Sequence, residues 1–103
     1  MFIINIKRIE LQKILETIVP NVYFQPPSSY MLEYPAIIYS INTIQAYYAD
    51  NKKYQKNDSY KLILVTEDPD NNYVDEILNL PLCSFNTHYC SDNLNHYVFT
   101  IYY

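Results

Sequence analysis

The residues of this chain best suited to chemistry are two cysteines and two histidines near the C-terminus. They are Cys83, His88, Cys90 and His96. Thiolates and imidazoles are the usual ligands of zinc, and a thiol beside an imidazole is the nucleophile–base pair of thiol enzymes. The spacing matches no zinc signature, and the chain has no glycine for a nucleophile elbow or a phosphate-binding loop. We therefore expect free thiols, hydrogen-bonded histidines and no cofactor; a metal site built on His88, Cys90 and His96, or a Cys90 nucleophile, is the lesser alternative.

Three carboxylates form a second candidate, at Glu67, Asp68 and Asp70. Carboxylates this close together could act as acid and base or bind a cation. The run Asp-Pro-Asp is also typical of a helix start, where aspartate caps the helix and proline fits the first helical position. Acidic side chains there complement the positive end of the helix dipole. We expect the structural role, with Asp68 as the cap.

The element that must position the cysteines and histidines is a predicted hairpin over residues 82–103, with its turn near Ser91, Asp92 and Asn93. Side chains alternate along a strand, so the second strand has two faces. One face carries Tyr97, Phe99, Ile101 and Tyr103, and the other carries His96, Val98, Thr100 and Tyr102. Neither face is polar, which predicts a helix layer on one side and another subunit, strand or ligand on the other. By the same alternation Cys83 and Cys90 should point to opposite faces.

The remaining pattern predicts one α+β domain over residues 1–103. Apolar spacing and prolines indicate a helix over about 4–20, strands over 21–25, 36–41 and 58–67, a loop or long hairpin tip over 47–57, and a helix from Asp68 to Pro81. This order predicts a mainly antiparallel sheet of four to five strands with two helices on one face and a C-terminal β-hairpin.

Composition excludes several classes of function. The chain has 103 residues, a net charge of −4 and seven basic residues, so it lacks the basic stripe of a nucleic-acid-binding protein. We also expect neither secretion nor membrane insertion, because the apolar runs are short and interrupted by charges. The two cysteines lie too far apart on one strand for a disulfide, which suits a reducing cytoplasm.

Parts of the sequence resemble a known family. The residues that carry this resemblance are the stretch 33–39 (EYPAIIY), the segment 48–51 (YADN), the turn 68–70 (DPD) and above all the end of the chain from Leu80, LPLCSFNTHYCSDNLNHYVFTIYY. Together they look like the small tail-completion, or tail terminator, proteins of long-tailed bacteriophages. The resemblance covers most of residues 33–103 and is densest in the hairpin.

The resemblance implies a virion structural protein and not an enzyme. Such proteins form a ring, commonly of six subunits, that caps the tail tube and joins it to the head connector or neck protein, while DNA passes through the lumen without specific binding. Assembly would take place in the host bacterial cytoplasm. The alternatives are a small metal-dependent or thiol enzyme and a monomeric adaptor for protein interaction.

A ring requires two different patches on each subunit. We expect the 47–57 segment and the hairpin to supply contacts with neighbouring subunits or with the tube. The expected contact residues are Tyr47, Tyr48, Asp50, Lys52, Lys53, Tyr54, Asp92, Asn93, His96, Ile101 and Tyr103.

Overall fold

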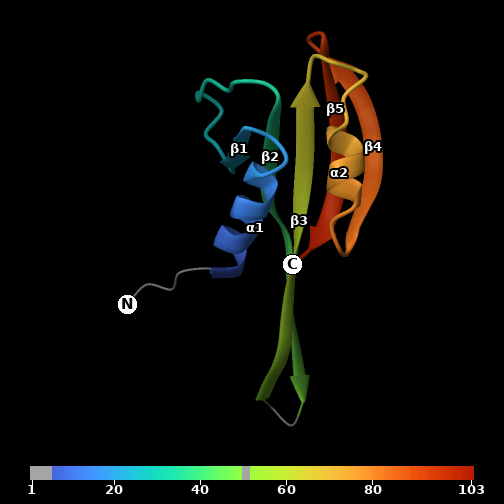
Figure 1. The fold of residues 1–103 in the computed structure, drawn as a ribbon. Helices are drawn as coiled ribbons and strands as arrows, with labels where there is room; N and C mark the ends of the chain where they lie inside the picture. Colours follow the sequence, from blue (N-terminus) through green and yellow to red (C-terminus); the bar gives the residue numbers. More distant parts are fainter. Residues whose placement is uncertain (1–5, 50–51) are drawn as a thin grey trace.

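The computed structural model describes residues 6–49 and 52–103, which form seven elements (Figure 1). In chain order they are α1 (Ile6–Glu16), β1 (Asn21–Phe24), β2 (Ala36–Ala49), β3 (Lys52–Thr66), α2 (Tyr73–Leu78), β4 (Cys83–Ser91) and β5 (Leu94–Tyr102). Neither helix has the length and apolar character that crossing a membrane would require in this described part of the chain.

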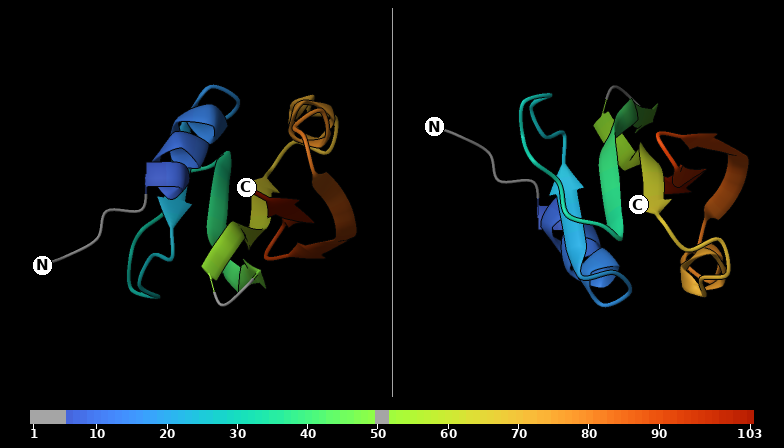
Figure 2. Two further views of the ribbon diagram at one scale, coloured as in Figure 1. Left: turned by 90° about the horizontal axis from the view of Figure 1, so that it is seen from below. Right: turned by 90° about the horizontal axis from the view of Figure 1, so that it is seen from above.

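The five strands form one sheet in the order β1-β2-β3-β5-β4. Only β1 and β2 run parallel, while β2–β3, β3–β5 and β5–β4 are antiparallel. Both helices lie on the same side of this sheet, α1 near β1 and β2 and α2 near β4 and β5 (Figure 2). The predicted α+β class, with helices on one face and a C-terminal hairpin, is confirmed.

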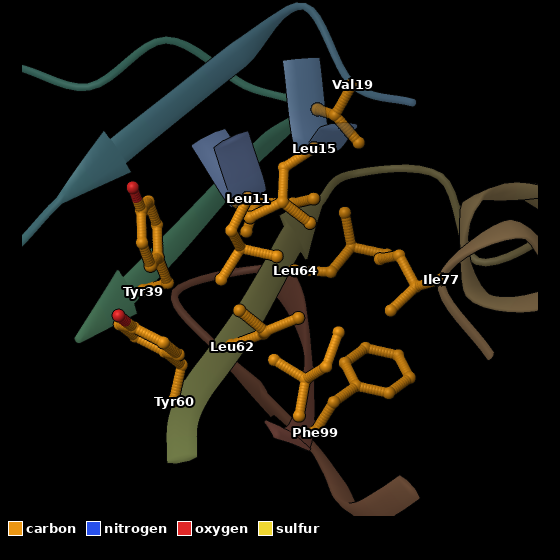
Figure 3. Packing of buried hydrophobic residues seen from close by; sticks show 11 residues of the cluster. Leu11, Leu15, Val19, Tyr39, Tyr60, Leu62, Leu64, Ile77 and Phe99 are labelled. Atoms are coloured by element: carbon orange, nitrogen blue, oxygen red, sulfur yellow. The ribbon is translucent and has the colours of Figure 1, made fainter. Parts of the chain in front are cut away.

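The core lies between the helices and the sheet (Figure 3). Leu11 and Leu15 are one helical turn apart, and Val19 continues their line just after α1. Alternate residues of the three central strands face them, and Ile77 closes the core from α2. The buried strand residues of this cluster are Ile37, Tyr39, Tyr60, Leu62, Leu64, Phe99 and Ile101. Each large apolar side chain buried here contributes roughly 1.5–3 kcal/mol.

The hydroxyl of Tyr39 is a polar group that reaches into this core from the sheet. Tyr39 is fully buried, and its hydroxyl donates a hydrogen bond to Gln12 Oε1 and accepts one from Arg8 Nη1 at 3.1 Å. Burial raises the pKa of the Tyr39 hydroxyl above its usual 10.0, while the Arg8 charge acts in the opposite direction. The Arg8 guanidinium also lies 4.3 Å from the centre of the Phe24 ring. These contacts attach α1 to the sheet.

The two edge strands differ in how freely they could pair with another chain. At one edge β1 is four residues long, and its Val22 carbonyl accepts a hydrogen bond from Gln12 Nε2 of α1 at 3.2 Å. At the other edge β4 has nine residues, and all of them after Cys83 are exposed. Charged residues and proline, which usually protect sheet edges, are absent from its sequence CSFNTHYCS.

The second helix begins later than predicted, and Asp68 does not cap it. Asp68 Oδ1 accepts the backbone N–H of Asp70 at 2.8 Å and so closes a local turn. The start of α2 is stabilised instead by Asn71 Oδ1, which accepts the N–H groups of Tyr73 at 3.0 Å and Val74 at 3.3 Å. Asp68 therefore stabilises the turn before the helix. Asn71, three residues later, accepts the first N–H groups of the helix, which have no acceptor within the helix itself.

The central strands are longer than predicted. Their pairing continues from Ala36↔Val65 to Ala49↔Lys52. Of the two expectations for residues 47–57, a loop or a long hairpin tip, the hairpin tip is confirmed, and residues 50 and 51 lie outside the described residues. Beyond Thr43 and Ser59 the two strands pair only with each other, because β1 ends at Phe24 and β5 begins its pairing at Ser59. We call segments 43–49 and 52–58 the arm. It projects from one end of the molecule, whose longest dimension is 51 Å (Figure 1).

Candidate functional site

The arm carries five of the residues expected to make subunit contacts. Tyr47 and Tyr48 lie on its β2 side, and Lys52, Lys53 and Tyr54 lie on its β3 side. Asp50, the sixth, lies outside the described residues. An isolated two-stranded ribbon is marginally stable in water, which makes a projecting one a candidate for docking against another surface.

The sheet face turned away from the helices is a second candidate surface. A row of apolar residues crosses it through the pairs Tyr23↔Ile38, Ile38↔Ile63 and Ile63↔Val98. We call these four residues the open-face row. Tyr23, Ile38 and Ile63 are half-buried, and Lys61 is the charged neighbour in the next row. Such a face, apolar at its centre and poor in charge, resembles the central part of a protein interface.

The predicted turn of the hairpin is confirmed at Asp92 and Asn93. Their φ angles are 52° and 63°, so both residues are left-handed, as a two-residue type I′ turn requires. Asp and Asn tolerate this conformation because their side chains bond to the local backbone. Both residues are exposed. The turn between β4 and β5 lies at the end of the molecule opposite the arm (Figure 1).

The four soft-ligand residues do not meet in one site within the chain. His88 Nε2 and Cys90 Sγ each lie 3.2 Å from Asn95 Oδ1, on the helix side of the hairpin. His96 points to the other face, where its ring stacks on Tyr89 at 4.7 Å. In the described ranges 6–49 and 52–103, no three His, Cys, Asp or Glu side chains are placed to hold a metal ion. The interpretation that joined His96 to His88 and Cys90 is therefore wrong for a single chain.

The prediction that Cys83 and Cys90 point to opposite faces of the strand is also wrong. Cys83 pairs with Ile101 and Cys90 with Asn95, two residues of β5 that share one face. The cause is a β-bulge between Phe85 and Thr87, which inserts Asn86 as an extra residue and shifts the alternation by one. Asn86 Nδ2 donates to Thr100 Oγ1 at 2.7 Å and so holds the bulge in place.

Two of the expected contact residues at the end of β5 belong to the body of the domain. Ile101 is 2% exposed and lies in the core, so it cannot contact a partner without unfolding the sheet. Its expected place on an interface is wrong for that reason. Tyr103 is half-buried against the core, and its hydroxyl donates to Glu10 Oε2 of α1 at 3.2 Å.

A shallow apolar groove between α1 and the entry to β4 was not predicted. It encloses about 220 Å³ and is lined by Leu11, Ile14, Leu80, Pro81, Leu82, Ile101, Tyr102 and Tyr103. Leu82 stands on its rim with 71% of its surface exposed and a left-handed φ of 58°. The sequence signal was the run Leu80-Pro81-Leu82, an apolar segment beside a helix-ending proline.

Comparison with known proteins places the chain in no family: no family model, no curated protein and no solved structure matches it. Function is therefore inferred from the residues and geometry described above.

Proposed function

We propose that this chain is a virion structural protein that assembles into a closed ring, caps the tail tube of a long-tailed bacteriophage and joins it to the head connector. The proposal rests on the likeness of the C-terminal hairpin to tail-completion proteins and on one structural observation. That observation is the arm, a ribbon that leaves the body of the sheet and pairs with nothing else in the described chain.

A closed ring needs a heterologous contact, in which one patch of each copy meets a different patch of the next. The arm and the open-face row are two such patches. The arm brings Lys52, Lys53 and Lys56 to one end of the molecule, and the open-face row offers an apolar surface with little charge. The arm would pack against the neighbouring copy or the tail tube, and the open-face row would be covered in the same assembly.

The test compares the wild type with a variant in which residues 44–57 are replaced by Asn-Gly. This variant keeps the pairing from Ala36↔Val65 to Thr43↔Ser59, so the core is untouched. We expect the wild type to form a ring by light scattering and to cap purified tail tubes in electron micrographs. The shortened variant should stay monomeric and fail to bind tubes, with an unchanged melting temperature.

A second variant tests the open-face row. Ile63→Lys places a charge at its centre and should prevent assembly, while Lys61→Ala, its exposed neighbour on β3, is the matched control. A wild-type protein that stays monomeric and leaves tail tubes uncapped would overturn the proposal. So would assembly that survives loss of the arm.

A further inference from the structure

The outer half of β4 is a regular strand with no partner on its free side within the described chain. It runs from Thr87, just after the bulge, to Ser91, just before the turn, and all five residues are exposed. They carry no formal charge at neutral pH with His88 neutral, so a second copy of the same strand would meet no repulsion there. Such an edge is a ready template for pairing.

The hairpin geometry determines which backbone groups this edge offers. The two-residue turn makes Ser91 and Leu94 a hydrogen-bonded pair, and bonded pairs alternate with non-bonded ones along antiparallel strands. Tyr89 is then bonded to His96 across the hairpin. His88 and Cys90 fall in the non-bonded pairs, so their N–H and C=O groups point outward to solvent.

The same two residues carry the soft ligands, and their surroundings hold them in place. The His88 ring stacks on Tyr97 at 4.6 Å, and Asn95 Oδ1 lies 3.2 Å from both His88 Nε2 and Cys90 Sγ. An amide oxygen only accepts, so in the neutral ring His88 Nε2 carries the proton and Nδ1 keeps its lone pair. Metal-binding histidines usually donate their second ring N–H to an oxygen in this way.

We propose that two copies pair their β4 strands antiparallel about a two-fold axis at Tyr89 and bind one Zn²⁺ between them. This register sets His88 of each copy opposite Cys90 of the other. The Cα atoms are then roughly 5.5 Å apart across the new pair and roughly 6.6 Å apart along each strand. Two His and two Cys side chains rise from this rectangle on one face, which is the ligand set of a closed tetrahedral zinc site.

Zinc binding at this site releases two protons and leaves the metal and its ligands without net charge. On binding, each Cys90 thiol loses its proton to solvent and gives up its hydrogen bond to Asn95, while His88 binds in its neutral form. Two thiolates cancel the charge of one Zn²⁺. Each chain supplies half of the ligands, so the site is incomplete without the second copy.

The opposite face of the same strand fits this dimer as well. Tyr89 is 45% exposed and stacks on His96. On the two-fold axis it would meet Tyr89 of the second copy in a non-bonded pair, where side chains come closest. Cross-strand aromatic pairs stabilise antiparallel strands. The dimer would therefore cover the exposed tyrosine as well as complete the metal site.

The experiment measures mass and metal content of the full-length protein with and without Zn²⁺, in the presence of a reductant and, in a parallel set of samples, without one. We expect zinc to be bound at one ion per two chains and to join copies in pairs, and a chelator to reverse this. Co²⁺ should give the thiolate-to-metal absorption bands of a site with two cysteines. Cys90→Ser and His88→Ala should abolish the effect, and Asn95→Ala should weaken zinc binding by about 10–100-fold.

Cys83→Ala is the matched control, because Cys83 lies on the same strand but half-buried against the core, and this variant should bind zinc as the wild type does. One zinc per chain, no zinc binding, or pairing that a reductant abolishes and a chelator does not would each overturn the proposal. The last outcome would indicate a Cys90 disulfide. The ratio of zinc to chains does not depend on the size of a ring, so failure here leaves the proposed function untouched.

Discussion

The half-buried thiol of Cys83 should be far less reactive than an ordinary cysteine. It packs against the core beside Ile101, and burial raises its pKa from the usual 9.0 to about 11. The thiolate is the reactive form, and a shift of about two units lowers its fraction by about 100-fold at pH 8 and below. Exclusion of the reagent by the surrounding core slows the reaction further.

The same shift links stability to pH. Because the folded pKa lies above the unfolded one, the stabilisation is fully present below pH 9 and is lost as the pH rises through about 11. At 1.36 kcal/mol per unit, two units correspond to at most about 2.7 kcal/mol. Solvent that reaches the half-buried thiol reduces the expected loss to about 1–2 kcal/mol.

The assay uses Cys90→Ala, which removes the exposed thiol and leaves Cys83 as the single reporter. A thiol-specific chromogenic reagent at about pH 8 should react about 100-fold more slowly with the folded variant than with the same chain in denaturant. The free energy of unfolding in urea is measured at rising pH for this variant and for the double variant lacking both cysteines. The difference between the two isolates the contribution of Cys83 to the pH dependence from that of the tyrosines. A folded-state rate within about threefold of the denatured rate would refute the reasoning.

Two further predictions concern the fold. Tyr39→Phe removes the hydroxyl that Gln12 Oε1 and the Arg8 guanidinium share. It should lower the free energy of unfolding in urea by about 1–3 kcal/mol. The control Tyr102→Phe, at an exposed tyrosine, should change that free energy by less than about 0.5 kcal/mol. Asp92→Val forces a β-branched residue to a φ of 52° and should lower the free energy of unfolding by about 1–2 kcal/mol. Each kcal/mol lost should lower Tm by roughly 4–8 °C. Asp92→Gly should melt close to the wild type.

Local alternation was enough to predict the sheet and the C-terminal hairpin. Strands such as Leu94–Tyr102 have two apolar faces, and the Asp92-Asn93 turn has its own backbone preference, so both are encoded within a few residues. The bulge at Asn86 was not predictable in this way. It depends on a hydrogen bond to Thr100, fourteen positions along the chain, which exists only once the hairpin has formed.

The candidate site could be predicted only in part. One extra residue at the bulge reverses which face every later side chain of β4 occupies, so parity counted from Cys83 gives the wrong face for Cys90. The facing of His96 away from His88 does not depend on the bulge: the turn sets it, because pairing from Ser91↔Leu94 places His96 opposite Tyr89 and His88 opposite Tyr97. For Ile101 the face was predicted, but not what covers it. The sequence pattern of an apolar residue in an alternating strand is the same whether that residue packs in the core, as Ile101 does, or against a partner.

The hydrogen bond from Gln12 to the Val22 carbonyl has a consequence for polymerisation. In the language of polymer chemistry, a unit that can join at both ends grows into a chain, whereas a unit with one reactive end stops at a pair. Of the two outer strands, β1 is short and has an acceptor occupied by α1, while β4 is open. Pairing through these two outer strands is therefore self-terminating: two copies can join at β4 without extending the sheet further at β1.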